Sequence, residues 1–332
     1  MQPSRLLLVC TVGYAAERYA AGMAKIAVVG SLNMDLVAVA PRIPVAGETI
    51  SGSNFFTVPG GKGANQAYAA AKLGGETAML GRVGEDDFGR AMRSNLASVG
   101  CDVTGVRTVA GPSGVALIFV AESGANCIVI APGANHKLVP GDIETDGSLF
   151  DGCRIALLQL ETPMETVTAA AVYAKRRGAR VILDPAPAPS GPLPEELLTA
   201  VDILTPNESE AAILAGLAPG PLTPDEAGAI ARKLQAKGTP TVIVKLGAQG
   251  CLLADGAKQQ LIPAPKVKVV DTTAAGDVFN AALAVALSEG QDLASACGFA
   301  VRAGAVSVTQ LGAQSSAPSR STVESQLAAE HD

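Results

Sequence analysis

The segment VVDTTAAGDVFN, residues 269–280, places a tight turn of small residues directly before a predicted helix. We expect a strand over residues 267–270, then the turn, then a helix that begins near Asp277. That helix is apolar nearly all round, which predicts that it is buried. Its N-terminus would then present free N–H groups and the positive end of the helix dipole to the protein interior.

The small residues of this turn favour a bound anion. Ala274, Ala275 and Gly276 have no bulk that would keep a phosphate away from the helix N-terminus. Asp277 stands at the same place, and Asp271 is a second acid beside the turn. Asp277 can be a helix N-cap, or it can be a base that takes the proton of an alcohol attacking a phosphoryl group.

Short apolar runs alternate with longer Ala-rich stretches along most of the chain. The runs predict buried strands at residues 26–29, 78–83, 155–159, 181–184, 203–205, 242–246 and 251–254. The stretches between them predict helices at residues 64–73, 89–98, 164–177, 208–215 and 224–237. This alternation implies an α/β fold in which helices cover both faces of a parallel sheet.

Two stretches, residues 35–58 and 114–130, break this alternation. Each holds two apolar runs around a turn, which predicts a β-hairpin rather than a strand–helix–strand unit. We expect the two hairpins to form a small antiparallel sheet that acts as a lid over the main sheet. The alternative is an ordinary extension of the edge of the main sheet.

A glycine-rich segment, PGGKGANQ, spans residues 59–66. It is not a Walker phosphate-binding loop, because Gly63 rather than Ser or Thr follows Lys62. Its glycines allow the backbone to approach a ligand closely. Asn65 lies in the first turn of the next helix and offers both a donor and an acceptor. The alternative is a plain turn in which Asn65 only starts the helix.

Polar residues and glycines follow several predicted strands, at the ends where ligands bind in open α/β sheets. Asn33 and Asp35 follow the first strand and either contact two adjacent sugar hydroxyls or form an Asx-turn. The same placement holds for Glu161, Asn207, Glu210, Gly247 and Gly250.

Composition excludes several classes of function. The 332-residue chain carries a net charge of −6, so it has no electrostatic footprint for nucleic acid. His136 and His331 are its 2 histidines, which argues strongly against a Ser/His/Asp triad or a His-rich zinc site. The 6 cysteines are scattered and indicate reduced thiols rather than a disulfide framework.

The N-terminal residues have a pattern of their own. An apolar run at residues 6–12 follows Arg5 and is far too short to span a bilayer. Met23 stands shortly before the first predicted strand, with Ala24 and Lys25 between them, and makes a natural start. We therefore interpret residues 1–22 as an upstream extension, disordered or not translated; a signal peptide is the minority interpretation.

These segments resemble the ribokinase branch of the PfkB-type carbohydrate kinases. The resemblance covers residues 25–316 and is carried by DTTAAGD at 271–277 and GGKGAN at 60–65. It implies a Rossmann-like parallel sheet with helices on both faces and a small β-sheet lid. The kinase domain would span residues 23–332, with lid segments at about 35–58 and 114–130.

The same resemblance implies an activity and a location. The expected reaction is ATP-dependent phosphorylation of D-ribose at its 5-hydroxyl, which gives ribose 5-phosphate. Mg²⁺ and a monovalent cation, commonly K⁺, are the expected metal ions. We also expect a homodimer formed through the lids, a cytoplasmic location, and no nucleic-acid or membrane partner.

Residue roles follow from the resemblance as well. Asp277 would be the base, and Ala274, Ala275 and Gly276 would form the anion hole. The expected sugar contacts are Asn33, Asp35, Gly61, Lys62, Asn65, Glu161 and Asp277. The nucleotide side would comprise Asn207, Glu210, Lys245, Gly247 and Gly250, with Glu210 acting on Mg²⁺ through water. The monovalent cation would lie at Asp271, Thr273 and Ser316.

Two alternatives remain. The first is a kinase for another small sugar or for a nucleoside on the same scaffold, and the 3% aromatic content weakly disfavours a nucleoside, whose base needs a stacking partner. The second is a non-catalytic sugar-binding protein. The intact Asp277 and its small-residue turn argue against that second reading.

Overall fold

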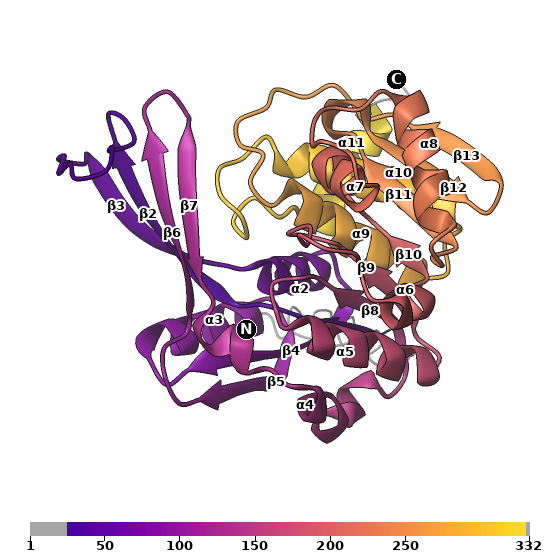
Figure 1. The fold of residues 1–332 in the computed structure, drawn as a ribbon, viewed down its shortest axis with the longest axis horizontal. Helices are drawn as coiled ribbons and strands as arrows, with labels where there is room; N and C mark the ends of the chain where they lie inside the picture. Colours follow the sequence, from indigo (N-terminus) through magenta and orange to yellow (C-terminus); the bar gives the residue numbers. More distant parts are fainter. Residues whose placement is uncertain (1–24, 330–332) are drawn as a thin grey trace, which may run out of the picture.

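The computed structural model of the chain describes residues 25–329. The interpretation of residues 1–22 as an extension concerns residues outside that range, as does His331. The described chain forms a nine-stranded sheet with helices on both faces, and a separate four-stranded sheet (Figure 1). The predicted α/β class is therefore confirmed.

The nine-stranded sheet has the order β13-β12-β11-β10-β9-β8-β1-β4-β5. Its strands are β1 (Lys25–Val29), β4 (Glu76–Gly84), β5 (Asp102–Val109), β8 (Cys153–Leu158), β9 (Arg180–Leu183), β10 (Ile203–Leu204), β11 (Thr241–Lys245), β12 (Cys251–Asp255) and β13 (Lys258–Ile262). From β11 to β5 every neighbouring pair is parallel. The antiparallel hairpin β12–β13 completes one edge.

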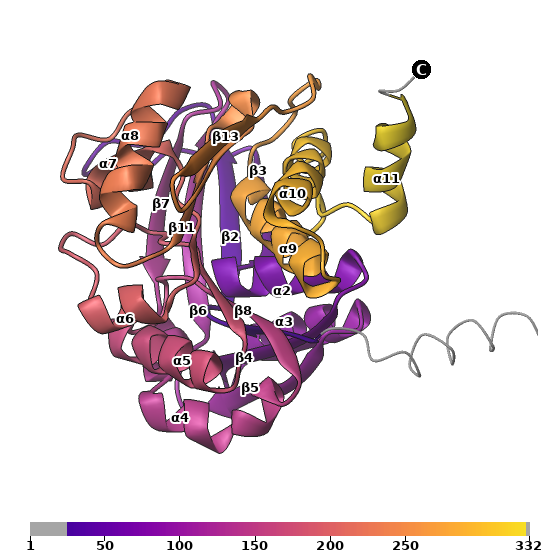
Figure 2. The same cartoon turned by 90° about the vertical axis from the view of Figure 1, so that its right-hand side faces the viewer.

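Two hydrophobic cores lie on opposite faces of this sheet. Strand β1 shows the division, because Ile26 and Val28 belong to one core while Ala27 and Val29 belong to the other. The first core is covered by α2 (Lys62–Lys72), α3 (Asp87–Ser98), α9 (Ala275–Ser288) and α10 (Leu293–Ser307). The second is covered by α4 (Pro140–Thr145), α5 (Met164–Arg176), α6 (Glu195–Ala200), α7 (Glu208–Leu214) and α8 (Pro224–Gln235). Figure 2 shows the two helical layers on either side of the strands, with α11 (Arg320–Ala329) outside α10.

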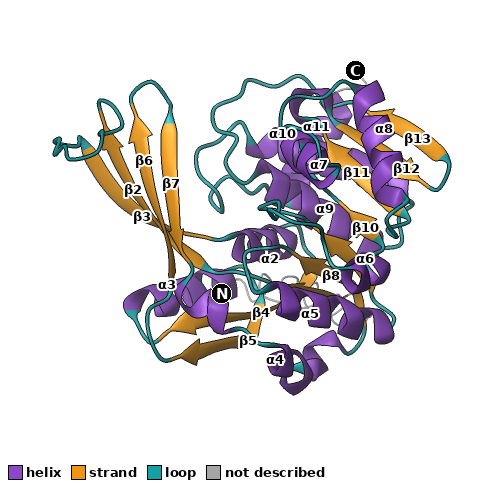
Figure 3. Cartoon of the chain, viewed as in Figure 1, coloured by secondary structure: helices purple, strands orange, loops and turns teal. Residues whose placement is uncertain are grey.

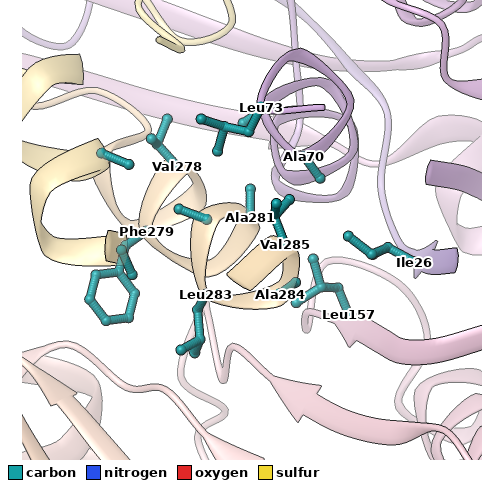
Figure 4. Packing of buried hydrophobic residues seen from close by; sticks show 14 of the residues in the cluster. Ile26, Ala70, Leu73, Leu157, Val278, Phe279, Ala281, Leu283, Ala284 and Val285 are labelled. Atoms are coloured by element: carbon teal, nitrogen blue, oxygen red, sulfur yellow. The ribbon is translucent and has the colours of Figure 1, made fainter. Parts of the chain in front are cut away.

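Helix α9 is buried along almost its whole length, as its sequence predicts. Every residue from Asp277 to Ser288 is buried. Figure 4 shows its side chains between α2, which contributes Ala70 and Leu73, and β8, which contributes Leu157. The many alanines of α9 let these neighbours approach closely. Ala275 and Gly276 at its N-terminus are partly exposed, so the buried part of α9 begins at Asp277.

The strand predicted over residues 267–270 does not form. Residues 263–274 hold no strand, and Val269 and Val270 are 57% and 51% exposed. The N–H groups of Val270 and Asp271 both donate to the carbonyl of Val308, at the end of α10, at 2.7 and 3.2 Å. Two hydrogen bonds to one carbonyl do not make the regular pairing of a strand. The apolar residues of this segment therefore lie at the surface without a neighbouring strand.

The four-stranded sheet has the order β3-β2-β6-β7 and is separate from the main sheet. It consists of β2 (Asn33–Ala40), β3 (Asn54–Gly60), β6 (Gly114–Ala121) and β7 (Asn126–Ala131), which project from the main body (Figure 3). Both predicted hairpins are present, and the edge-extension alternative is wrong. The expectation of a purely antiparallel sheet is also wrong: β2 and β6 pair in parallel, because both leave the main body at the same level, Asn33 opposite Gly114.

No helix of residues 25–329 is both long enough and apolar enough to cross a membrane.

Candidate functional site

Asp277 is the third residue of α9 and is 5% exposed. Its Oδ2 accepts a hydrogen bond from Asn65 Nδ2 at 3.0 Å, and its Oδ1 accepts one from Gln66 Nε2 at 3.1 Å. The N-cap of α9 is Ala274, so the N-cap interpretation of Asp277 is wrong. The carboxylate is held by α2 instead of by its own helix.

The turn before α9 has an unusual backbone. Ala274 has φ 59° and is the single non-glycine residue with positive φ among residues 25–329. A left-handed conformation costs an L-residue about 1–2 kcal/mol. Such strain is found mainly where function requires it, and here it sets the direction in which α9 starts. The N–H of Ala275 donates to the carbonyl of Thr272 at 3.2 Å, and the N–H of Val278 donates to that of Ala274 at 2.9 Å. The N–H groups of Gly276 and Asp277 are therefore the ones left for a ligand.

The charges around Asp277 act in opposite directions. Burial raises the pKa of Asp277 to about 6, the Lys62 ammonium lowers it, and the carboxylate of Asp184 raises it. Burial also opposes the charged form of Lys62, but the carboxylates of Asp277, Asp184 and Glu161 outweigh burial and raise the pKa of that ammonium. Lys62 is therefore a cation enclosed by acids.

Glu161 and Asn33 are both fixed by hydrogen bonds. Glu161 Oε2 accepts from the hydroxyl of Ser31 and from the N–H of Lys62, the latter at 3.0 Å. Asn33 is 2% exposed, and its Oδ1 accepts from Asn135 Nδ2 at 2.8 Å. The contacts of Glu161 join the segment after β8 to the start of α2 and to Ser31, just before β2, and the contact of Asn33 joins β2 to the 3₁₀ helix Gly133–Lys137.

Asp35 lies in the same group of acids. Its pKa is raised to about 7, mainly by burial and in addition by the carboxylates of Glu161 and Asp277. The sequence predicts that the adjoining glycines let the backbone approach a ligand, whereas the structure shows a close approach of Gly61 to the backbone of the protein itself. Gly61 has φ 88°, and a Cβ on it would lie 2.7 Å from the backbone nitrogen of Asn33. A plain turn would not require that contact.

The structure thus brings the predicted sugar-side residues to one place. They surround Asp277 from the lid, from α2 and from the segment after β8: Asn33, Asp35, Gly61, Lys62, Asn65 and Glu161.

The predicted nucleotide-side residues begin at α7. Asn207 is the N-cap of α7 and forms a reciprocal pair with Glu210: Asn207 Oδ1 accepts from the Glu210 N–H at 2.9 Å, and Glu210 Oε2 accepts from the Asn207 N–H at 2.8 Å. Burial raises the pKa of Glu210, Lys245 and Lys62 lower it, and Asp184 raises it further. Asn207 also forms an isolated parallel bridge with Lys245.

The two glycines that follow β11 differ in their surroundings. Gly247 has φ 54° and open space around its Cα, so a ligand can approach it. Gly250 has φ 97°, and a Cβ there would lie 2.0 Å from the carbonyl oxygen of Ile262. Gly250 is therefore required by the packing of β13, whatever else it does.

The predicted cation site lies where two turns meet. Asp271 Oδ1 accepts from the N–H and hydroxyl of Thr273 at 2.9 and 2.6 Å, and its Oδ2 accepts from the Gly312 N–H at 2.8 Å. Burial opposes ionisation, but these hydrogen bonds outweigh it and lower the pKa of Asp271. Ser316 is fully buried and donates to the carbonyl of Ala313 at 2.9 Å. Residues 312–316 thus adjoin Asp271, though no hydrogen bond joins its carboxylate to Ser316 directly.

The sequence interpretation missed several buried polar residues. Asp184 accepts from Lys245 Nζ at 2.9 Å and from Gln66 Nε2 at 3.1 Å. Gln159 Nε2 donates to Gln66 Oε1 at 2.7 Å. The position of two of these residues in the sequence could have indicated the site, because Asp184 ends a predicted strand and Gln66 ends the glycine-rich segment. Asn135, in the short 3₁₀ helix Gly133–Lys137, had no such signal.

Within the described part of the chain, no three His, Cys, Asp or Glu side chains group as a metal site. The acids around Asp277 come instead from β2, α7 and α9 and from the segments after β8 and β9. Five carboxylates face two ammonium groups there, from Asp35, Glu161, Asp184, Glu210 and Asp277 against Lys62 and Lys245.

Known proteins are similar to this chain in sequence and in fold. Residues 23–320 match the pfkB family carbohydrate kinases. A ribokinase of Bacillus subtilis is 43% identical over 306 residues, which cover 92% of this chain and 100% of that protein. A deoxyribokinase of Salmonella typhi is 40% identical over 295 residues, which cover 89% of this chain and 95% of that protein.

A solved structure gives the same picture. The Arabidopsis thaliana ribokinase complexed with ribose and ATP superposes with a TM-score of 0.84 at 37% identity. The match covers 91% of this chain and 98% of the plant chain.

Proposed function

This chain belongs to the pfkB family of carbohydrate kinases, and on that basis we propose that it transfers the terminal phosphoryl group of ATP to the 5-hydroxyl of D-ribose. The observation that carries the proposal is the buried carboxylate of Asp277, held by Asn65 and Gln66 at the N-terminus of a buried helix. A matching relative of known structure binds ribose and ATP.

Asp277 would act as the general base. With a pKa of about 6 its carboxylate is ionised at neutral pH and can accept the proton of an attacking hydroxyl. As the sugar oxygen bonds to phosphorus, the bond from phosphorus to the bridging oxygen of ATP breaks and ADP leaves. The two side-chain donors from α2 fix the carboxylate in the geometry that this proton transfer needs.

The turn at Ala274, Ala275 and Gly276 would stabilise the transferring group. Negative charge that develops on the phosphoryl oxygens meets the first N–H groups of α9 and the positive end of its dipole. Lys62, which stays charged among its acidic neighbours, adds a compact cation on the sugar side. Asn33, Asp35 and Glu161 would hold the ring hydroxyls of the sugar.

The donors present fit Mg²⁺ bound mainly through the nucleotide. Mg²⁺ is usually held by one or two carboxylates together with substrate phosphates, not by a protein cage. Glu210 fits that role, because one of its oxygens caps α7 and the other is left for a metal-bound water. When bound, Mg²⁺ would neutralise phosphate charge, which a site with more carboxylates than lysines requires. Asn207, Lys245, Gly247 and Gly250 would contact the nucleotide.

The turns at Asp271 and Ser316 fit a monovalent cation. Asp271 is kept ionised by its hydrogen bonds, and the neighbouring turns supply carbonyl and hydroxyl oxygens, which suit a hard cation such as K⁺. We propose that Asp271, the carbonyl of Thr273 and Ser316 hold this ion. Since Asp271 precedes the anion turn by three residues, a cation there would rigidify that turn.

The outer face of the lid supports a homodimer. Phe55 and Phe119 pair with Ala38 from opposite sides, so they share the face that points away from Asp35. Leu117 and Val129 lie on that same face, and the four side chains are 39–64% exposed. An apolar patch of this kind marks an interaction site. Leu117→Asp, compared with the wild type by sedimentation velocity, tests this: a dimer that persists in the variant rejects the lid interface.

We further propose that residues 23–332 act as one kinase domain, with lid segments at about 35–58 and 114–130, in the cytoplasm. Cys101, Cys127, Cys251 and Cys297 are free thiols, as a reducing compartment allows.

An ADP-release assay over a panel of sugars tests the central proposal. The panel holds D-ribose, 2-deoxyribose, fructose and a nucleoside, each with and without Mg²⁺ and K⁺. We expect the highest kcat/KM with ribose, loss of turnover on Mg²⁺ removal, and ribose 5-phosphate by phosphorus NMR. A higher kcat/KM with another acceptor makes this a kinase for that compound. Sugar binding by calorimetry without ADP release identifies a non-catalytic binding protein.

A further inference from the structure

The ammonium of Lys245 has an unusual position at the end of β11. It lies 2.9 Å from Asp184 Oδ1, and its side chain is 13% exposed. A Cβ on Gly276 would lie 3.3 Å from Lys245 Nζ, so the ammonium sits directly beside the anion turn. A lysine has three N–H donors, and within residues 25–329 one of them is used, by Asp184. Two donors are left beside the first turn of α9.

Asp184 is held as firmly as the ammonium it binds. Its side chain is 3% exposed, and its Oδ2 accepts from Gln66 Nε2 at 3.1 Å. The same nitrogen donates to Asp277 Oδ1 at 3.1 Å. Gln159 Nε2 donates to Gln66 Oε1 at 2.7 Å, so the amide orientation is fixed and its two N–H bonds go to different carboxylates.

This bridge brings two buried carboxylates close together, which costs free energy. Packing does not require it, since an uncharged residue at 184 would avoid the repulsion with Asp277. The arrangement is explained if the position of the Lys245 ammonium matters for the reaction. Asp184 binds that ammonium, and Gln66 fixes the distance from Asp184 to the base, Asp277.

We propose that Lys245 is a catalytic residue that hydrogen-bonds the phosphoryl group during its transfer, and that Asp184, tied to Asp277 through Gln66, is the positioning residue that holds the ammonium beside Gly276. This inference rests on the proposed kinase function and deepens it. It gives Lys245 a role in the transition state rather than in nucleotide binding alone. One chain of hydrogen bonds, through Gln66 and Asp184, would then fix the positions of both the base Asp277 and the Lys245 ammonium.

The first test compares Lys245→Met with Lys245→Arg, and uses Lys237→Met as the matched control. Lys237 follows α8 and donates to the carbonyl of Leu214 in α7, and it has no contact with Asp184 or Asp277 among the described residues. With the sugar that the wild type phosphorylates, we expect Lys245→Met to lower kcat by about 10²–10³-fold. KM for the sugar should stay within about threefold, and Lys245→Arg should recover part of the loss. A kcat within about threefold of wild type overturns the inference.

A binding measurement separates the transition state from the ground state. Calorimetry on the whole chain with ribose and ADP, with and without aluminium fluoride as a phosphoryl mimic, reports each affinity. We expect Lys245→Met to keep its affinity for ADP and to lose most of the extra affinity that aluminium fluoride gives. Equal losses in both would make Lys245 a nucleotide contact only and reject the catalytic role.

Asp184→Asn tests the positioning role with a readout that a structural role would not move. Asp277 is faced by Lys62, Asn65 and Gln66 of α2, by Asp184 after β9, and by Asp35 of the lid. Since Asp184 raises the pKa of Asp277, the variant should shift the acidic limb of kcat/KM to lower pH and also lower kcat. An unshifted limb with wild-type kcat rejects the role.

A double variant completes the series. If Asp184 acts through Lys245, the variant with both substitutions should be no slower than Lys245→Met alone, and thermal melting checks that each variant is folded. Additive losses would show that Asp184 acts elsewhere. Failure of the wild type to phosphorylate any sugar is a separate outcome, which rejects the kinase function and this inference together. Wild-type turnover with unaffected variants rejects this inference alone.

Discussion

Gly60 lies so close to Asp35 that a Cβ on it would be 2.4 Å from the carboxylate oxygen Oδ2. The two residues belong to neighbouring strands of the lid, because Asn33 pairs with Gly60 and Asp35 with Val58. Gly60 therefore sets the position of Asp35 through its missing side chain. Its backbone conformation does not require glycine, since its φ is not positive.

Gly60→Ala should weaken sugar binding. The added methyl group must displace the Asp35 carboxylate, and a shift of about 1 Å can cost about 10²-fold. We expect KM for ribose to rise by about 10- to 100-fold and KM for ATP to stay within about threefold. Gly220→Ala is the control, because a Cβ there meets no atom within 4 Å. Equal rises in both KM values would contradict a sugar-side role for Asp35.

Asp277→Asn should abolish most turnover and keep the fold. The amide preserves the shape of the side chain but cannot accept a proton, and general base catalysis contributes about 10²–10⁴-fold. We expect kcat to fall by that factor with an unchanged circular dichroism spectrum. Turnover near that of the wild type would remove Asp277 from the mechanism.

The pH dependence of the wild type should report the same carboxylate. The pKa of Asp277 is raised to about 6 by burial, so the base is lost by protonation as the pH falls below that value. We expect kcat/KM to be level above pH 7 and to fall about tenfold per pH unit well below the pKa. Rates at pH 5 and pH 8 that agree within twofold would contradict the assignment.

Asp35→Asn should stabilise the protein at high pH. Burial raises the pKa of Asp35 to about 7, so the folded state binds this proton more tightly than the unfolded state does. That contribution is fully present below the unfolded pKa of about 3.9 and is lost as the pH rises through the folded pKa. We expect the variant to melt about 2 °C or more above the wild type at pH 8. The gap should shrink at pH 5, and a gap that widens there would refute the sign.

Ala274→Gly should stabilise the protein slightly, whereas Ala275→Gly should destabilise it. Ala274 has φ 59°, where alanine is strained and glycine is not, so the change should contribute up to about 1 kcal/mol after the entropy of glycine is subtracted. Ala275 is the first residue of α9, where glycine costs up to about 1 kcal/mol. Denaturant titration of both variants measures the contrast, and the same sign for both would contradict the strained turn.

Local pattern predicted most of the fold but not its edges. The buried parallel strands are apolar runs, and every apolar run predicted between residues 26 and 254 became a strand. Strands β5 and β13 were missed, since DVTGVRTV and KQQLI are largely polar segments on the two outer edges of the sheet. The opposite error occurred at residues 267–270, where an apolar run has no strand beside it. Whether each of these segments forms a strand depends on a neighbouring strand with which it can pair, and not on its composition.

The candidate site could be predicted only where its residues share a local motif. The glycine-rich segment and the turn before Asp277 are each continuous in sequence. The contact from Gln66 to Asp184 joins residues 118 positions apart, and no local pattern reports such a pair. The same holds for Asn135, which lies 102 positions from Asn33. Whether Asp277 caps its own helix or faces α2 also depends on how two helices pack.

The lid has one further consequence, because Asn33 and Asp35 are on its first strand while Asp277 is on the main body. Any tilt of the small sheet changes the spacing between the Asp35 and Asp277 carboxylates, which repel each other when both are ionised. A sugar that hydrogen-bonds to both carboxylates would offset this repulsion and hold the small sheet close to the main body. The distance between the two carboxylates should therefore depend on pH and be widest where both acids are charged.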